Sequence, residues 1–77
     1  MANTSTKEGI ERFIDRCRKT GLKVTPQRIA IYQVLMASRT HPSADTVYRE
    51  MVATHPTISF DTVNRTLLTF AEIGVIT

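Results

Sequence analysis

The residues best suited to chemistry with a partner lie in the last third of the chain, in the segment SFDTVNRTLLTFAEI at residues 59–73. Val63, Leu67 and Phe70 recur here at the spacing of one helix face, which predicts a helix that buries this face in the core. The first two turns then present short polar side chains and one Arg, a set suited to hydrogen bonding with DNA base edges. The predicted DNA-contacting residues of this helix are Asp61, Thr62, Asn64, Arg65 and, on its flank, Thr69.

The same helix leaves a second function open. Leu68 lies on the outward side, and Asp61 and Glu72 place two carboxylates near the single Arg65, which weakens the electrostatic attraction to DNA. The alternative to DNA binding is therefore a protein-protein interaction module built on the same scaffold. If nothing else in the chain agreed, a merely solvated helix face would be the simplest interpretation.

Start and stop signals predict three further helices ahead of this one. Ser43 and Ser59 are placed as N-terminal caps, and the Thr25-Pro26 pair supplies a cap followed by proline at the first helical position. Glycine in the left-handed conformation is the common residue just beyond a helix end. The helices are expected at about residues 7–20, 26–37, 44–54 and 59–73, with Gly21 and Gly74 as stops.

Each predicted helix carries an apolar stripe that could join one small core. Cys17 lies on the first stripe, and because the chain has one cysteine we interpret it as a small buried apolar group. In the second helix, the spacing leaves open whether Ile31 or Tyr32 faces inward. The predicted core residues are Ile10, Phe13, Ile14 and Cys17; Ile29, Ile31 or Tyr32, Leu35 and Met36; Val47, Tyr48, Met51 and Val52; and Val63, Leu67 and Phe70.

The last two helices and the turn HPTI between them predict a helix-turn-helix in which the second helix reads DNA. After Gly74, the β-branched residues 75–77 indicate the start of a strand, the first half of a wing hairpin. The expected fold is mainly α, a winged helix-turn-helix of four helices with the wing truncated after its first strand. We expect residues 1–6 to form a disordered tail, and residues 7–77 to be the DNA-binding fragment of a longer chain.

Composition narrows the function further. The chain has 77 residues, a net charge of +3 and a pI near 9.5, which favours an anionic partner. Six basic residues fall between Arg12 and Arg28 against the single Asp15. No apolar run approaches the roughly 20 residues that span a bilayer, and no secretion signal is present, so we expect a cytoplasmic protein with no membrane partner. A catalytic nucleophile needs an identifiable base, and His41 and His55 each lie next to a proline in separate loops, so we expect no enzyme.

Three blocks of the sequence resemble one known family. GLKVTPQR at residues 21–28, HPSADTVY at 41–48 and ISFDTVNRTLLTFAEIGVI at 58–76 are similar, in order and spacing, to the N-terminal DNA-binding domain of ferric uptake regulators. The resemblance implies a metal-responsive bacterial repressor whose winged helix binds double-stranded operator DNA. It also implies a following domain, absent from this sequence, that forms a homodimer and carries most metal ligands. We expect a monomer without cofactor for these residues alone, and a divalent metal (iron, zinc or manganese) in the full-length protein.

The resemblance also implies roles for single residues. Lys23 matches a basic position that reaches the minor groove, although a solvated surface lysine fits equally. Arg28 would contact a phosphate or pair with a nearby carboxylate, while Thr62 and Arg65 match positions that face the major groove. His41 aligns with a histidine that binds the regulatory metal in many members, a role possible only in the full-length protein.

One position departs from the family pattern. The family usually has tyrosine in TVYRTL, where this chain has Asn64. A tyrosine ring can pack on thymine methyl groups, whereas an asparagine amide can donate to and accept from an adenine edge. The AT-rich operator of the family therefore cannot be assumed for this protein.

Overall fold

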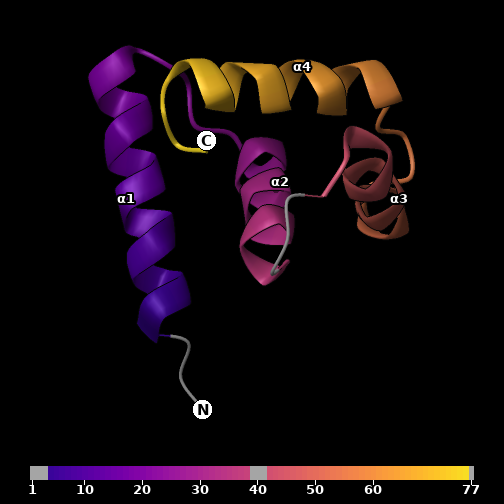
Figure 1. Ribbon diagram of the computed structural model, residues 1–77, viewed down its shortest axis with the longest axis horizontal. Helices are drawn as coiled ribbons and strands as arrows, with labels where there is room; N and C mark the ends of the chain where they lie inside the picture. Colours follow the sequence, from indigo (N-terminus) through magenta and orange to yellow (C-terminus); the bar gives the residue numbers. More distant parts are fainter. Residues whose placement is uncertain (1–3, 39–41, 77) are drawn as a thin grey trace.

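Four helices carry most of the chain that the computed structural model describes, which comprises residues 4–38 and 42–76 (Figure 1). Their order agrees with the sequence analysis, and the helix-turn-helix follows from α3, the turn and α4. The helices are α1 (Thr4–Thr20), α2 (Pro26–Ala37), α3 (Ala44–Thr54) and α4 (Phe60–Glu72).

Side-chain caps open three of the helices, as predicted. Thr25, Ser43 and Ser59 each accept a hydrogen bond on the side-chain oxygen from the backbone N–H three residues later, at 3.2, 3.2 and 3.1 Å. Each bond satisfies an N–H that the helix itself leaves unpaired. The starts of α2, α3 and α4 are therefore fixed locally by the sequence.

Glycine ends α1 and α4, also as predicted. Gly21 has a φ of 81°, and the N–H of Leu22 donates to the Cys17 carbonyl at 2.8 Å. Gly74 has a φ of 83°, and the N–H of Val75 returns to the carbonyl five residues before it at 3.0 Å. This hydrogen-bond pattern is the Schellman motif, which favours glycine because the left-handed conformation strains residues with a Cβ.

The two ends of the chain differ from expectation. α1 begins at Thr4 and not near Lys7, because residues 4–7 contain neither proline nor an interior glycine to stop the helix. The expected tail thus overlaps α1 from residue 4 onward, and residues 1–3 lie outside the described part.

The prediction of a wing strand after Gly74 is wrong for the residues that the structure describes. Val75 and Ile76 form no strand and instead pack, partly buried, against the core, while Thr77 lies outside the described part. A strand needs a pairing partner, and residues 4–38 and 42–76 contain no other strand. Here the chain turns back beneath α4 (Figure 1).

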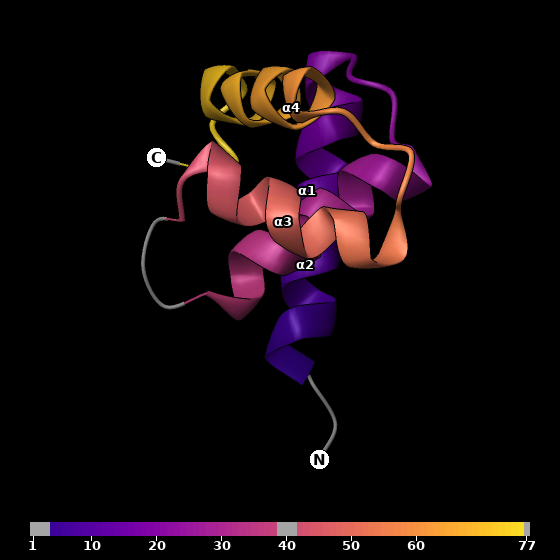
Figure 2. The ribbon, with the colours of Figure 1, turned by 90° about the vertical axis from the view of Figure 1, so that its right-hand side faces the viewer.

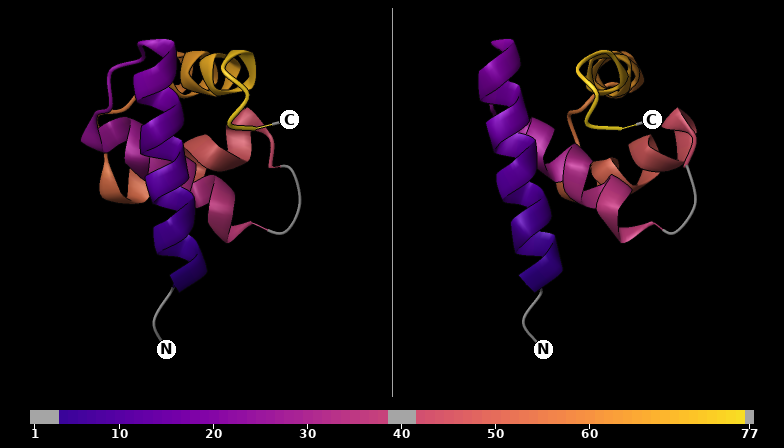
Figure 3. Two further views of the ribbon diagram at one scale, coloured as in Figure 1. Left: turned by 90° about the vertical axis from the view of Figure 1, so that its left-hand side faces the viewer. Right: turned by 60° about the vertical axis from the view of Figure 1, so that its left-hand side comes forward.

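α2 is the central helix. It packs against α1, α3 and α4, while α3 and α4 also pack on each other. Figure 1 shows α4 lying across one end of the molecule, above α2 and α3, with α1 standing alongside. Figure 2 shows α3 in front of α2 and beneath α4, and Figure 3 shows α4 nearly end-on at the same end.

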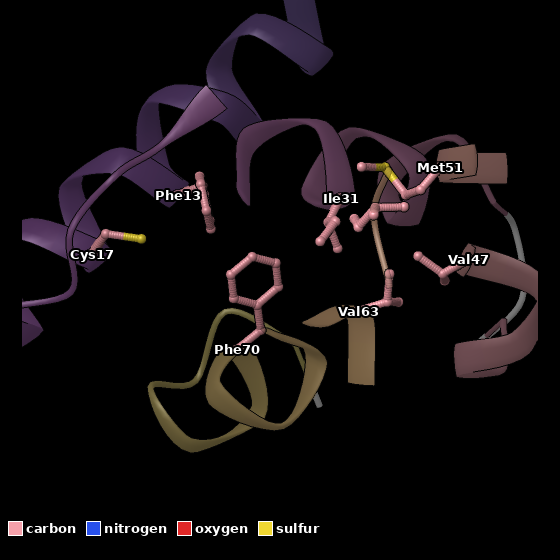
Figure 4. Packing of buried hydrophobic residues seen from close by; sticks show 8 residues of the cluster. Phe13, Cys17, Ile31, Val47, Met51, Val63 and Phe70 are labelled. Atoms are coloured by element: carbon pink, nitrogen blue, oxygen red, sulfur yellow. The ribbon is translucent and has the colours of Figure 1, made fainter. Parts of the chain in front are cut away.

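An aromatic cluster joins α1, α2 and α4 at the centre of the core (Figure 4). The Phe13 ring stacks on Tyr32 with centroids 4.4 Å apart and meets the edge of Phe70 at 5.1 Å. Ile31 is fully buried, and Tyr32 is partly buried against the same core. The spacing did not decide whether Ile31 or Tyr32 faces inward. In the structure both do, because α2 has neighbours on several sides.

Burial of Phe70 is expected to stabilise the fold strongly. Phe70→Ala removes a fully buried ring that packs on two others, and should lower the free energy of unfolding by about 3–5 kcal/mol. Leu68→Ala, two residues away on the outer side of α4 and 60% exposed, should change it by less than about 0.5 kcal/mol. Urea unfolding followed by circular dichroism measures both, and equal losses would contradict the packing described.

Cys17 is fully buried at the end of α1, as predicted, and points into the cluster in Figure 4. Burial raises the pKa of the Cys17 thiol because the thiolate would lose its water, and the positive charge of Arg28 offsets this only in part. The buried thiol is therefore held in its neutral form.

This shift predicts a loss of stability at high pH. The unfolded thiol ionises first, so the contribution of Cys17 is complete below its ordinary pKa of 9.0 and is lost as the pH rises through the raised folded-state value. The free energy of unfolding, measured by urea titration at pH 7 to 10.5, should fall more steeply for the wild type than for Cys17→Ala. Parallel profiles for the two proteins would contradict the shift.

Candidate nucleic-acid interface

A tight turn sets the position of α4 relative to α3. The His55 N–H donates to the Met51 carbonyl at 2.7 Å, and the Ile58 N–H donates back to the His55 carbonyl at 3.0 Å. Ile58 is 6% exposed and anchors the turn in the core ahead of α4. No non-glycine residue of the described chain has a positive φ, which explains why the turn needs no glycine.

The inner side of α4 is apolar with one exception. Val63 and Phe70 are fully buried and Leu67 packs partly buried against the same core, as predicted. Thr66 is also buried, which the sequence analysis missed, although its i+3 spacing from Val63 would have indicated it. Its hydroxyl donates to the Thr62 carbonyl at 2.8 Å, so this buried polar group is satisfied.

The outer side of the first two turns carries the predicted polar front, which we define as Asp61, Thr62, Asn64 and Arg65. Arg65 Nε lies 3.1 Å from Asp61 Oδ2, and the two side chains are 79% and 68% exposed. Thr62 is tied to the cap, because the Ser59 hydroxyl donates to Thr62 Oγ1 at 2.9 Å. The Asn64 amide makes no hydrogen bond within residues 4–38 and 42–76, which leaves its donors and acceptor available.

The remaining outward residues of α4 continue this surface. The Thr69 hydroxyl, on the turn after Arg65, donates to the Arg65 carbonyl at 3.0 Å. Leu68 is 60% exposed, and Phe60 is 45% exposed with its ring at the edge of Tyr48, 5.9 Å between centroids. The outer side is thus mixed, with polar groups and one exposed leucine.

A hydrogen bond joins Arg28, in the first turn of α2, to Lys23 in the loop between α1 and α2. Arg28 Nη1 donates to the Lys23 carbonyl at 2.6 Å, so the guanidinium braces the loop backbone. Within the described residues Arg28 has no carboxylate partner, and the Lys23 side chain is exposed without an ion pair. The structure therefore brings together the two basic residues that the sequence placed five positions apart.

The loop that carries Lys23 and the outer side of α4 lie at the same end of the molecule. The views in Figures 1 to 3 are related by rotation about the vertical axis, and in each of them α4 and the C-terminal end of α1 share one height. The loop leaves α1 at this end. Along α4, the loop lies beside the last turns, whereas the polar front lies on the first turns, above α3 (Figure 1).

The outward side of α1 adds a basic surface. Arg12, Arg16 and Lys19 follow one another at helical spacing and, with Asp15, surround a shallow depression of about 260 Å³. Asp15 pairs with Lys19 at 3.1 Å. Among the described residues, Arg12 and Arg16 have no such partner, so their charges are free to meet an anion.

No metal site forms within residues 4–38 and 42–76, where no three His, Cys, Asp or Glu side chains gather. His41, the predicted ligand, lies outside the described residues. The described residues thus do not fit a metal on their own. None of the helices described here is long and apolar enough to cross a membrane.

The four helices contain a helix-turn-helix whose second helix has an outward polar side, the helical part of a winged-helix domain, and no wing is formed in residues 4–38 and 42–76. The family model "Ferric uptake regulator family" matches residues 19–77. This chain belongs to the ferric uptake regulator family.

Individual relatives agree with the family. The peroxide-responsive repressor PerR of Staphylococcus aureus strain Mu50 is 38% identical over 72 residues, which cover 94% of this chain and 49% of that protein, and the strain USA300 protein gives the same values. The solved structure of GAS PerR-Zn-Zn is similar with a TM-score of 0.80 and 30% identity, over 86% of this chain and 42% of that one. The chain spans about half the length of these relatives.

The brace between Arg28 and the loop gives a testable prediction. Arg28→Ala should increase amide hydrogen exchange in residues 22–24 and leave α3 unchanged, because the only bond lost holds the loop. The loss in free energy of unfolding should stay below about 1 kcal/mol, since this bond is exposed. Arg18→Ala, an exposed arginine on α1, is the control in the NMR exchange measurement. Identical exchange in the two variants would show that Arg28 does not brace the loop.

Proposed function

We propose that this chain binds duplex DNA with sequence specificity, as the DNA-binding domain of a metal-responsive transcriptional repressor. The observation that carries the proposal is the polar front of α4, which is held outward by the buried Val63 and Phe70. A helix of this kind, second in a helix-turn-helix, fits the major groove and meets base edges with its first turns.

Phosphate and base contacts fall to different residues in this proposal. Arg12, Arg16, Lys19 and the loop residue Lys23 are exposed cations suited to the DNA backbone, with Arg28 as a brace of the loop. Lys23 on its loop would reach the neighbouring minor groove. Base edges would be read by the front of α4 (Asp61, Thr62, Asn64 and Arg65), with Thr69 on the flank.

Asn64 sets the expected sequence preference. Its amide is half-exposed and makes no hydrogen bond among the described residues, so it can pair with the N6 and N7 atoms of adenine. The Thr69 hydroxyl donates its proton to the helix backbone, whereas the Thr62 hydroxyl accepts from the cap and keeps its own O–H as a donor. We expect an adenine opposite Asn64 in the preferred site.

The regulatory part of the proposal concerns the longer protein. The relatives named above are peroxide-responsive repressors, and the similar solved structure is named with zinc. We propose that the full-length protein is a homodimer that responds to a divalent metal, iron, zinc or manganese, with His41 as one ligand. The 77 residues alone would bind a half-site as a monomer, and no part of the DNA contact described here depends on a metal.

A second candidate is a protein-interaction module. It is favoured by Leu68, which is exposed at the centre of the outer side of α4. Leu68→Ala distinguishes the two functions, because this change should leave DNA affinity within about twofold if the polar front is the reader.

The test compares Arg65→Ala with Arg49→Ala, which removes the same side chain from the same position of the neighbouring helix α3. After selection of a preferred duplex from random sequences, affinities for it and for a scrambled duplex are measured by fluorescence anisotropy at several salt concentrations. Arg65→Ala should reduce the preference by about 1–3 kcal/mol, whereas Arg49→Ala should leave it unchanged.

Salt dependence supplies the second part of the test. The wild type should lose affinity with a log–log slope of about 0.9 per phosphate neutralised. Retention of the full sequence preference by Arg65→Ala would show that α4 is not the reader. Indifference of the wild type to DNA at low salt would overturn the proposed function itself.

A further inference from the structure

The helices α3 and α4 begin on the same short pattern, Ser-x-Asp-Thr-Val-x-Arg, at residues 43–49 and 59–65. Both copies form the same structure. The serine caps the helix, the valine is fully buried, and the aspartate pairs with the arginine four residues later. The Asp–Arg distances are 3.0 Å in α3 and 3.1 Å in α4. The Asp–Arg ion pair therefore forms from the local sequence pattern itself, since it is present in both copies.

The copy in α4 differs in its surroundings. Asp61 and Arg65 form half of the polar front, so in the proposed complex a carboxylate would enter a groove bordered by phosphates. Exposed ion pairs of this kind are weak in water, so Asp61 restrains the position of Arg65 only loosely. The negative charge instead opposes any approach of the front to the DNA backbone.

The atoms of the pair decide what Arg65 can still bind. Asp61 Oδ2 lies 3.1 Å from Nε, one of the guanidinium donors, and among the described residues the two terminal Nη groups have no ion-pair partner. These Nη groups lie in one plane and can donate together to O6 and N7 of a guanine. The same Nη groups could also donate to a phosphate, but the neighbouring carboxylate would repel it.

We propose that Asp61 is a positioning residue that makes Arg65 read guanine in preference to phosphate. This inference rests on the proposed function and adds a specificity device to it. The preferred duplex then contains a guanine opposite the first two turns of α4, next to the adenine expected at Asn64.

The experiment compares Asp61→Asn with Asp45→Asn in duplex binding. Asp45 occupies the same second helical position after the same cap, and its loss changes the net charge and the helix start equally. For each protein, affinity is measured for the selected duplex, for a duplex with the guanine replaced by adenine, and for a scrambled duplex.

Asp61→Asn should lower the preference for guanine over adenine by about tenfold. It should also bind the scrambled duplex more tightly, with a salt slope steeper by about 0.9, because Arg65 gains a phosphate. Asp45→Asn should leave the guanine preference unchanged, and Asp61→Glu, which restores the charge, should keep it near the wild-type value. In an Arg65→Ala background, Asp61→Asn should have no effect on the preference.

The outcomes separate this inference from the function on which it rests. If the wild type selects a sequence but Asp61→Asn leaves the guanine preference intact, or the selected site has no guanine in the groove, the positioning role is overturned and the proposed function stands. An equal loss in Asp45→Asn would assign the effect to charge alone, and would also overturn it. If the wild type binds no duplex DNA, both fail.

Discussion

The whole arrangement depends on the burial of the inner side of α4. Phe70 meets the ring of Phe13 from α1 and that of Tyr32 from α2, while Val63 is fully buried nearer the start of the helix. In a chain of this size each fully buried ring is a large part of the net stability. Since one side of α4 is fixed inward, its polar side has no freedom to turn, and the surface offered to a partner follows from the core.

The local sequence at the helix ends determines where the helices begin and end. Serine or threonine caps open α2, α3 and α4, and glycine closes α1 and α4 with the same backbone hydrogen bonds. These bonds decide where each helix begins or ends, and the core decides how the helices meet. Because the turn between α3 and α4 is tied at His55 and Ile58, α4 is held at a fixed angle to α3.

Much of this could be predicted from the sequence, because caps, stops and helical spacing are local signals. Two features that were not predicted depend on contacts between distant residues. Tyr32 faces inward together with Ile31 because α2 is surrounded, and the strand expected from Val75 is absent because the described residues offer it no partner. The order of the helices, the cap residues and the outward polar front were all available from spacing alone.

The sequence predicted which side chains α4 turns outward, but not the geometry of their contacts. Spacing places Asp61 and Arg65 one turn apart, but the atoms joined, Nε and Oδ2, are visible only in the structure. The bond from Arg28 to the Lys23 carbonyl spans a non-helical loop, for which no periodic pattern exists. The resemblance in three sequence blocks identified the family, and the family match over residues 19–77 confirms it.

The most direct test of the central claim is an NMR titration of the isotope-labelled chain with its selected DNA duplex. If the outer side of α4 enters the groove, the largest shift changes should fall on residues 61–69 and on the loop at 21–25, with little change at the buried Ile31 in α2. Changes confined to other surfaces, with the amide and side-chain signals of Asn64 and Arg65 unmoved, would contradict the account.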